Sequence, residues 1–202
     1  MQIWAAGLVV LLGVACEGMT VARTFEYVSQ ERSVYAQVSN VSAQRSASDF
    51  APWVNVIATA ILGNRGADSL QSSAFGSNEL SFSGSVDTTT SGAGLTNAKG
   101  VFDVMFTLAA ATHVEFFWFT EANWNLTLWT PTTTRILATA AQSGKNANES
   151  LFFEAGTYRL RADSDVSNGA AGNAAYVLTI VPAPTSLAVL GAVGLLAARR
   201  RR

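Results

Sequence analysis

Residues 102–108 read FDVMFTL, and this stretch decides the fold class because apolar side chains recur at every second position. A period of two is typical of a β-strand with one face on the core and the other in solvent. The face predicted to point inward here consists of Phe102, Val104, Phe106 and Leu108. The same alternation recurs at 34–38, 80–86, 114–118, 124–128, 158–162 and 176–180. The sequence therefore predicts a chain built mostly of strands.

Turn-forming residues separate these runs, at 91–94, 97–100, 142–148 and 167–173. Short strands with such spacing and no long amphipathic helix predict a single all-β domain, an antiparallel β-sandwich of jelly-roll-like type, over residues 23–181. One-sided alternation favours antiparallel over buried parallel strands. Residues 46–78 are ambiguous, since 51–61 could form a strand or a short helix opening at Pro52; we interpret this stretch as strand, with a turn at 64–66.

The stretch FEAGTYRLRA, residues 153–162, resembles the late hairpin of many bacterial jelly-roll domains. In those domains a glycine begins a strand whose alternate aromatic and aliphatic residues enter the core. The resemblance concerns architecture and implies no activity.

Charge and rare residues exclude several classes of function. The chain has 13 basic and 14 acidic residues and a formal net charge of −1, so no nucleic-acid partner is expected. Cys16 is the only cysteine and His113 the only histidine. Neither a cysteine metal site nor a second catalytic histidine is available, and no phosphate-loop or nucleophile-elbow motif occurs. We expect no cofactor, no metal and no catalytic residue.

Residues 1–22 are expected to be a signal peptide. The apolar run from Ile3 to Cys16 is uncharged and too short for a comfortable membrane span, but it suits the core of a signal. Small residues make cleavage after Ala15 or Ala22 plausible. A basic segment before the run is missing, and lipidation of Cys16 is an alternative.

The C-terminus, residues 182–202, has three parts in order: Pro182-Ala183-Pro184, an apolar run from Leu187 to Ala198, and the cluster Arg199, Arg200, Arg201 and Arg202. As a helix the apolar run would be about 18 Å long, which is short of the roughly 30 Å hydrocarbon core of a bilayer. Counted back to Pro182, and with the arginines snorkelling, it comes close to a short transmembrane helix. The arginines are expected on the cytoplasmic side, which puts the preceding domain outside. This orientation agrees with an N-terminal export signal.

This tripartite tail resembles the PEP-CTERM sorting signal of Gram-negative bacteria, with Ala183 where glutamate is usual. The resemblance implies processing by a membrane-embedded exosortase, after transient anchoring in the inner membrane. It also implies a final place in the cell envelope, at the cell surface or in the extracellular matrix, and an association with exopolysaccharide. An ordinary tail anchor is the alternative. The sequence thus favours a non-catalytic, exported surface or matrix protein.

A carbohydrate-binding sandwich is the alternative function. Trp118 and Trp124 fall on the inward phase of their strands, whereas Trp129 and Phe117 fall on the outward phase and are expected on one solvent face. Together with Trp53, they are the candidate sugar-stacking residues.

A secreted glycoside hydrolase is less favoured. It would need two carboxylates in one cleft, and the candidate pairs are Glu115 with Glu121 and Glu149 with Glu154. The stretch 163–168, DSDVSN, offers oxygen ligands for calcium but is interpreted as a polar turn, and His113 as a surface residue.

Overall fold

The computed structural model describes residues 23–90, 94–139, 141 and 144–181, and these residues form twelve strands and no helix. The expected signal peptide, residues 1–22, and the expected sorting tail, residues 182–202, lie outside the described residues. The prediction of an all-β domain is confirmed for the described residues.

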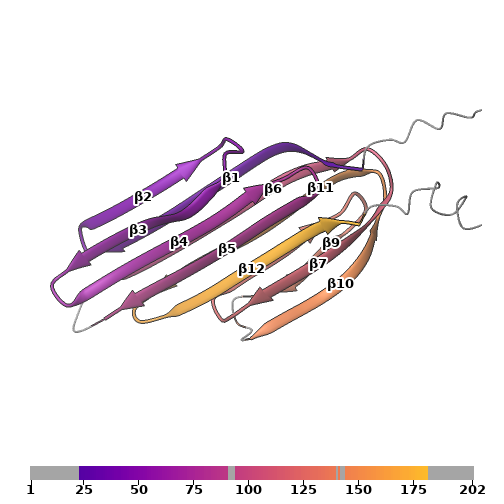
Figure 1. The fold of residues 1–202 in the computed structure, drawn as a ribbon. Helices are drawn as coiled ribbons and strands as arrows, with labels where there is room; N and C mark the ends of the chain where they lie inside the picture. Colours follow the sequence, from indigo (N-terminus) through magenta and orange to yellow (C-terminus); the bar gives the residue numbers. More distant parts are fainter. Residues whose placement is uncertain (1–22, 91–93, 140, 142–143, 182–202) are drawn as a thin grey trace, which may run out of the picture.

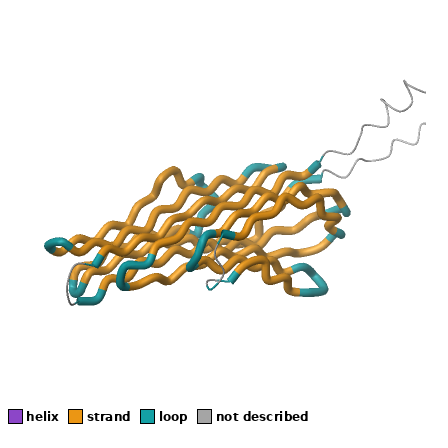
Figure 2. The backbone as a smooth tube through the Cα atoms, turned by 90° about the horizontal axis from the view of Figure 1, so that it is seen from below, coloured by secondary structure: helices purple, strands orange, loops and turns teal. Residues whose placement is uncertain are grey.

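The strands form two antiparallel six-stranded sheets that face each other as a β-sandwich (Figures 1 and 2). Sheet A contains, in spatial order, β2 (Val41–Ala47), β1 (Phe25–Val38), β6 (Thr96–Leu108), β11 (Gly156–Ser167), β8 (Trp124–Trp129) and β9 (Thr134–Ala138). Sheet B contains β10 (Lys145–Phe153), β7 (Thr112–Thr120), β12 (Ala171–Ile180), β5 (Glu79–Thr89), β4 (Arg65–Phe75) and β3 (Trp53–Leu62).

The core lies between the sheets and is made by the side chains that the alternation placed inward. Phe102 of sheet A is fully buried, and its ring centroid lies 5.0 Å from that of Phe82 and 5.6 Å from that of Tyr176, both in sheet B. All seven alternating runs bury the predicted face. Aromatic contacts across the two sheets therefore hold the sandwich together.

The ambiguous stretch is a hairpin. β3 and β4 pair antiparallel, so the interpretation as strand is confirmed, and the chain reverses at Gly63, whose φ of 62° favours glycine. The start of β3 is irregular, because the pairing shifts register between Trp53 and Val56, where Asn55 has a φ of 51°. A bulge therefore separates Trp53 from the regular part of the strand.

Trp124 fills a slot that two glycines leave open, one from each sheet. A Cβ atom on Gly84 of β5 would lie 2.8 Å from Trp124 Cη2, and one on Gly100 of β6 would also lie 2.8 Å from that atom. The indole is 1% exposed, and its ring lies 5.7 Å from that of Phe82. Glycine at both positions is what allows the indole to lie between the sheets.

A buried arginine lies in the part of the core that β1, β3 and β4 form. Arg32 lies on the inward phase of β1, with none of its surface exposed, and its guanidinium lies 4.7 Å from the Trp53 ring and 5.1 Å from the Phe75 ring. It donates hydrogen bonds to Gln30 Oε1, Ser73 Oγ, the carbonyl oxygens of Asp49 and Ala51, and the Asp49 carboxylate. Arg32 thus fixes the connection between β2 and β3.

Both ends of the described chain are held by one loop. The Phe25 N–H donates to the Ser77 carbonyl oxygen at 2.8 Å, and the Ile180 N–H donates to the Asn78 carbonyl oxygen at 2.8 Å. Residues 23 and 181 accordingly lie at the same end of the sandwich (Figure 1). The turns after β1, β3 and β5 lie at the opposite end.

Candidate functional site

Trp129 lies on the outer face of sheet A, beside a chain of paired polar side chains. The Arg159 guanidinium is 5.1 Å from the centre of the Trp129 ring. The same guanidinium makes a bidentate contact with Asp103, through Nε–Oδ1 at 2.8 Å and Nη2–Oδ2 at 2.5 Å. This hydrogen bonding raises the pKa of Arg159. The indole is thus held against a cation of fixed orientation.

The pairing continues along β11, which is one of the two middle strands of this face. Arg161 Nε donates to Asp163 Oδ1 at 2.9 Å, and Asn125 Nδ2 donates to Asp163 Oδ2 at 3.0 Å. Burial alone would raise the pKa of Asp165, but hydrogen bonds from Lys99 at 2.6 Å and Asn97 at 2.8 Å outweigh it and lower that pKa. The face therefore presents amide, carboxylate and guanidinium groups in fixed orientations. We call the side chains that make these contacts the polar ladder. They are Asn97, Lys99 and Asp103 of β6, Asn125 of β8, and Arg159, Arg161, Asp163 and Asp165 of β11.

Two shallow hollows lie beside the polar ladder, over β1 and β6. One, of about 520 Å³, is lined by Ser33, Tyr35, Gln37, Gln44, Leu95, Asn97, Lys99 and Val101. The other, of about 420 Å³, is lined by Ser29, Gln30, Glu31, Asp103, Met105 and Arg159. The outer face of sheet A thus has two shallow hollows and many hydrogen-bonding groups.

The interpretation of 163–168 as a polar turn is wrong for most of its length. β11 continues to Ser167, and the pairing of Asp163 and Asp165 with neighbouring strands explains why the chain stays extended there. Their carboxylate oxygens accept hydrogen bonds from protein groups. No group of three or more metal-ligating side chains that could hold an ion occurs in the described part of the chain.

The three candidate sugar-stacking residues do not share a surface. Phe117 is 44% exposed, but it belongs to β7 and lies on the outer face of sheet B, away from Trp129. Trp53 is half-buried over Arg32. The expectation of one face for Trp129 and Phe117 is therefore wrong, because alternation separates inward from outward without telling which sheet a strand joins. The predicted burial of Trp118 and Trp124 is confirmed.

Glu149 points into the edge of the sandwich and is already paired. Its Oε1 accepts a hydrogen bond from Arg135 Nη2 at 2.7 Å, and this bond lowers the pKa of Glu149. Trp118 Nε1 donates to the same oxygen at 3.4 Å. A carboxyl group with a lowered pKa is unsuited to the general-acid role in glycoside hydrolysis. Of the other candidates, Glu121 accepts a hydrogen bond from Asn173 at 2.6 Å.

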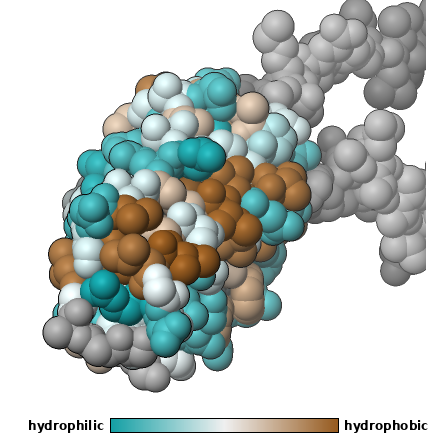
Figure 3. Space-filling view, turned by 90° about the vertical axis from the view of Figure 1, so that its left-hand side faces the viewer, coloured by the Kyte–Doolittle hydropathy of each residue, from teal (hydrophilic) through white to brown (hydrophobic). Residues whose placement is uncertain are grey.

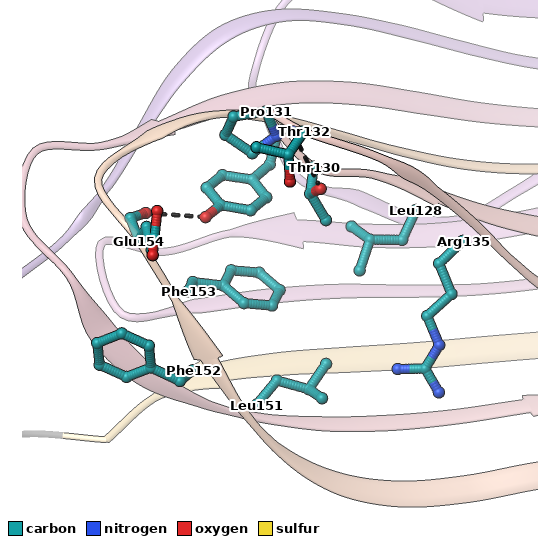
Figure 4. Close-up of a pocket in the computed structure, with 10 residues that line it drawn as sticks. Leu128, Thr130, Pro131, Thr132, Arg135, Leu151, Phe152, Phe153 and Glu154 are labelled. Atoms are coloured by element: carbon teal, nitrogen blue, oxygen red, sulfur yellow. Dashed lines mark hydrogen bonds between the residues drawn. The ribbon is translucent and has the colours of Figure 1, made fainter.

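An apolar cleft opens beside this ion pair, between the β8–β9 turn and β10 (Figure 4). It has a volume of about 310 Å³, and Leu128, Leu151 and Phe153 line it together with Pro131. The Phe153 ring stacks on Tyr158 at 4.5 Å. The sequence showed no signal for this cleft, because strand alternation does not tell which edge of a sandwich stays open.

His113 lies on the outer face of sheet B, where its ring is 5.2 Å from that of Phe152. It is exposed, as its interpretation as a surface residue predicts.

The chain matches no protein-family model, and no curated protein matches it significantly. The predicted sorting residues, Pro182 to Pro184 and Arg199 to Arg202, lie outside the described residues. Among the described residues, no helix has the length and apolar character needed to cross a membrane.

Proposed function

We propose that this protein is a non-catalytic, exported surface or matrix protein whose β-sandwich is displayed by a C-terminal sorting tail. The observation that supports display is the position of Ser77 and Asn78, which hold the first and last described strands at one end. A tether attached after Val181 would leave the opposite end of the sandwich, with the turns after β1, β3 and β5, facing away from the membrane.

In this proposal each part of the chain has one role. Residues 1–22 direct export and are removed. Pro182 and Pro184 keep the cleavage region extended around Ala183, because proline restricts its own φ angle and the conformation of the residue before it. Residues 187–198 hold the chain in the inner membrane as a short helix, and Arg199 to Arg202 fix its orientation. An exosortase-type enzyme then processes the tail.

The jelly-roll assignment belongs to the same proposal. From β5 to β12 the chain passes to the other sheet after each strand, apart from the β8–β9 hairpin. Such alternation between two antiparallel sheets is typical of jelly rolls. β8 and β9 form the hairpin at one end of sheet A, and their inward side chains belong to the core between the sheets.

The test is the intact mass and the cellular fraction of the protein in its native host. We expect mature protein that lacks both ends and lies outside the inner membrane. A Pro182→Ala/Pro184→Ala variant is expected to retain its C-terminus, whereas Thr185→Ala is the matched control beside the motif. A wild-type protein that keeps residues 182–202 in the inner membrane would refute sorting and leave a tail-anchored domain.

Binding of exopolysaccharide by the outer face of sheet A is the second candidate. Its support is Trp129, held by Arg159 beside the polar ladder, because planar polar groups of fixed orientation and an aromatic ring suit the recognition of sugars. Gel electrophoresis in the presence of the host's polysaccharide tests it. Trp129→Ala is expected to abolish retardation, while Phe117→Ala, on the other sheet, is expected to keep it. Equal retardation of both variants would reject this face.

A further inference from the structure

β3 is an edge strand without the charges that usually protect such an edge. It lies at the end of sheet B, paired with β4 on one side only. The other three edge strands of the two sheets contain Arg45, Arg135, and Lys145 with Glu149, whereas β3 reads WVNVIATAIL. A long, uncharged edge strand presents unpaired backbone groups that favour pairing with another strand.

Two outward side chains in the regular part of β3 are also apolar and branched. Ile57 is 51% exposed and Ile61 is 64% exposed, and the exposed Thr59 lies between them. Their neighbours Ala58 and Ala60 point inward and are each 1% exposed. The solvent-facing side of this strand therefore exposes branched apolar surface that a further strand would cover.

The apolar surface continues onto the end of the sandwich where β3 finishes. Figure 3 shows apolar residues gathered in one patch on this end. Leu62 at the end of β3 and Val41 at the start of β2 are each 37% exposed, and Leu95 is 51% exposed. A hydrogen bond from Ser39 N–H to the Leu95 carbonyl oxygen, 2.9 Å, holds the β1–β2 turn beside Leu95.

The sequence of the regular part of β3 identifies the partner. Residues 57–61 read IATAI, which is the same in both directions, with Thr59 at its centre. Two copies of this strand, antiparallel about a two-fold axis at Thr59, would place Ile57 opposite Ile61, Ala58 opposite Ala60, and Thr59 opposite Thr59. Opposed branched side chains stabilise antiparallel pairs, and Val56 would face Leu62 in the next position.

We propose that two copies of this chain pair through β3 in an antiparallel, two-fold arrangement that joins their B sheets into one continuous sheet. Each copy uses the same surface, so the assembly closes at two. The bulge at Asn55 ends the regular pairing on one side and Gly63 ends it on the other. This proposal concerns residues 56–62 and does not depend on the sorting tail.

Cysteine cross-linking tests the register directly. In the full chain with Cys16→Ser, Thr59→Cys is expected to form a covalent dimer on mild oxidation, because residues opposite each other in an antiparallel pair have Cβ atoms about 4.5–5.5 Å apart. Ser83→Cys is the matched control: it is exposed on the outer face of the same sheet, but on the interior strand β5. Equal cross-linking of the two variants, or none at Thr59, would overturn the proposal.

The mass of the full chain in detergent, measured by sedimentation, provides the second test. We expect a dimer for the wild type, loss of the dimer in Ile61→Lys, and a retained dimer in Val28→Lys, whose position on β1 is 55% exposed. Ile61 is exposed, so the substitution is expected to leave the far-ultraviolet circular dichroism unchanged. A monomeric wild type, an open-ended series of oligomers, or a dimer that survives Ile61→Lys would each contradict the two-fold β3 contact.

Discussion

The slot around Trp124 makes a sharp prediction about two glycines. Gly84→Ala and Gly100→Ala each place a Cβ atom 2.8 Å from Trp124 Cη2. Ordinary carbon–carbon contacts are about 3.5–4.0 Å, so the indole must move by roughly 0.7 Å or more to accommodate either methyl group. It cannot do so freely, because a Cβ on Gly84 would also lie 2.8 Å from Phe82 Cζ, and Gly172 closes the slot near Trp124 Cδ1.

The expected loss follows from two opposing effects. Overpacking a filled core costs about 1–3 kcal/mol, whereas replacing a strand glycine by alanine recovers about 0.5–1 kcal/mol of conformational entropy. Each alanine variant is therefore expected to lower the free energy of unfolding by about 1–2 kcal/mol. Trp124→Phe shortens the side chain and removes the clash, so Trp124→Phe/Gly100→Ala should be more stable than the sum of the single changes by about 1 kcal/mol.

Urea denaturation followed by circular dichroism measures these differences. Gly66→Ala is the control, because its Cβ would meet only the rotatable Thr89 hydroxyl, at 3.0 Å. We expect Gly66→Ala to be close to neutral and additive with Trp124→Phe. Additive effects of Gly100→Ala and Trp124→Phe would show that the indole is not confined between the sheets, and would refute the reasoning.

Three further predictions concern polar groups that are buried or paired. Arg32→Met is expected to lower the free energy of unfolding by about 2–3 kcal/mol, because the guanidinium holds buried partners and two backbone carbonyls. Asp49→Asn should cost less than about 1 kcal/mol, since the Asp49 side chain is 72% exposed; equal losses in urea denaturation would contradict this ranking. The lowered pKa of Glu149 means that its ion pair stabilises the fold above the ordinary carboxyl pKa and that this contribution is lost as the pH falls through the folded-state pKa. Thermal melts from about pH 6 to about pH 3 should accordingly show a shallower decline in Glu149→Gln than in the wild type, and parallel curves would reject this role. Gln71→Leu should raise the free energy of unfolding by about 1 kcal/mol, because both buried amide atoms lack a hydrogen-bond partner among the described residues; calorimetry that finds a loss would show the amide is satisfied.

The sequence predicts the inward faces of this fold well, because a one-residue shift would put a whole apolar face in solvent. The phase that buries Val34, extended backwards along β1, also reaches Arg32. The alternation thus predicts that Arg32 points inward. What makes its burial possible is contact with Trp53 and the Asp49 carbonyl oxygen, and the sequence does not show these contacts. Local alternation identifies the face of a residue, while its partners come from chain segments distant in sequence.

The sequence could not predict the arrangement of the strands in the same way. Trp129 and Phe117 have the same outward phase and lie on strands consecutive in the sequence, yet the two strands belong to different sheets. The polar ladder was also hidden, because Asp163 and Asp165 resemble turn residues until Lys99 and Asn125 are placed beside them. Pairing between strands distant in the sequence decides which sheet each strand joins and which side chains lie beside Asp163 and Asp165.

The place of β12 has a consequence for how the fold is completed. This last described strand lies inside sheet B, between β7 and β5, rather than at an edge. Until residues 171–180 arrive, β5 and β7 have no common neighbour, and Tyr176 is missing from the centre of the core. Sheet B can therefore be completed only after nearly all of the described residues have been synthesised. Because pairing between distant strands is slow to form, folding is expected to follow synthesis of the domain rather than accompany it.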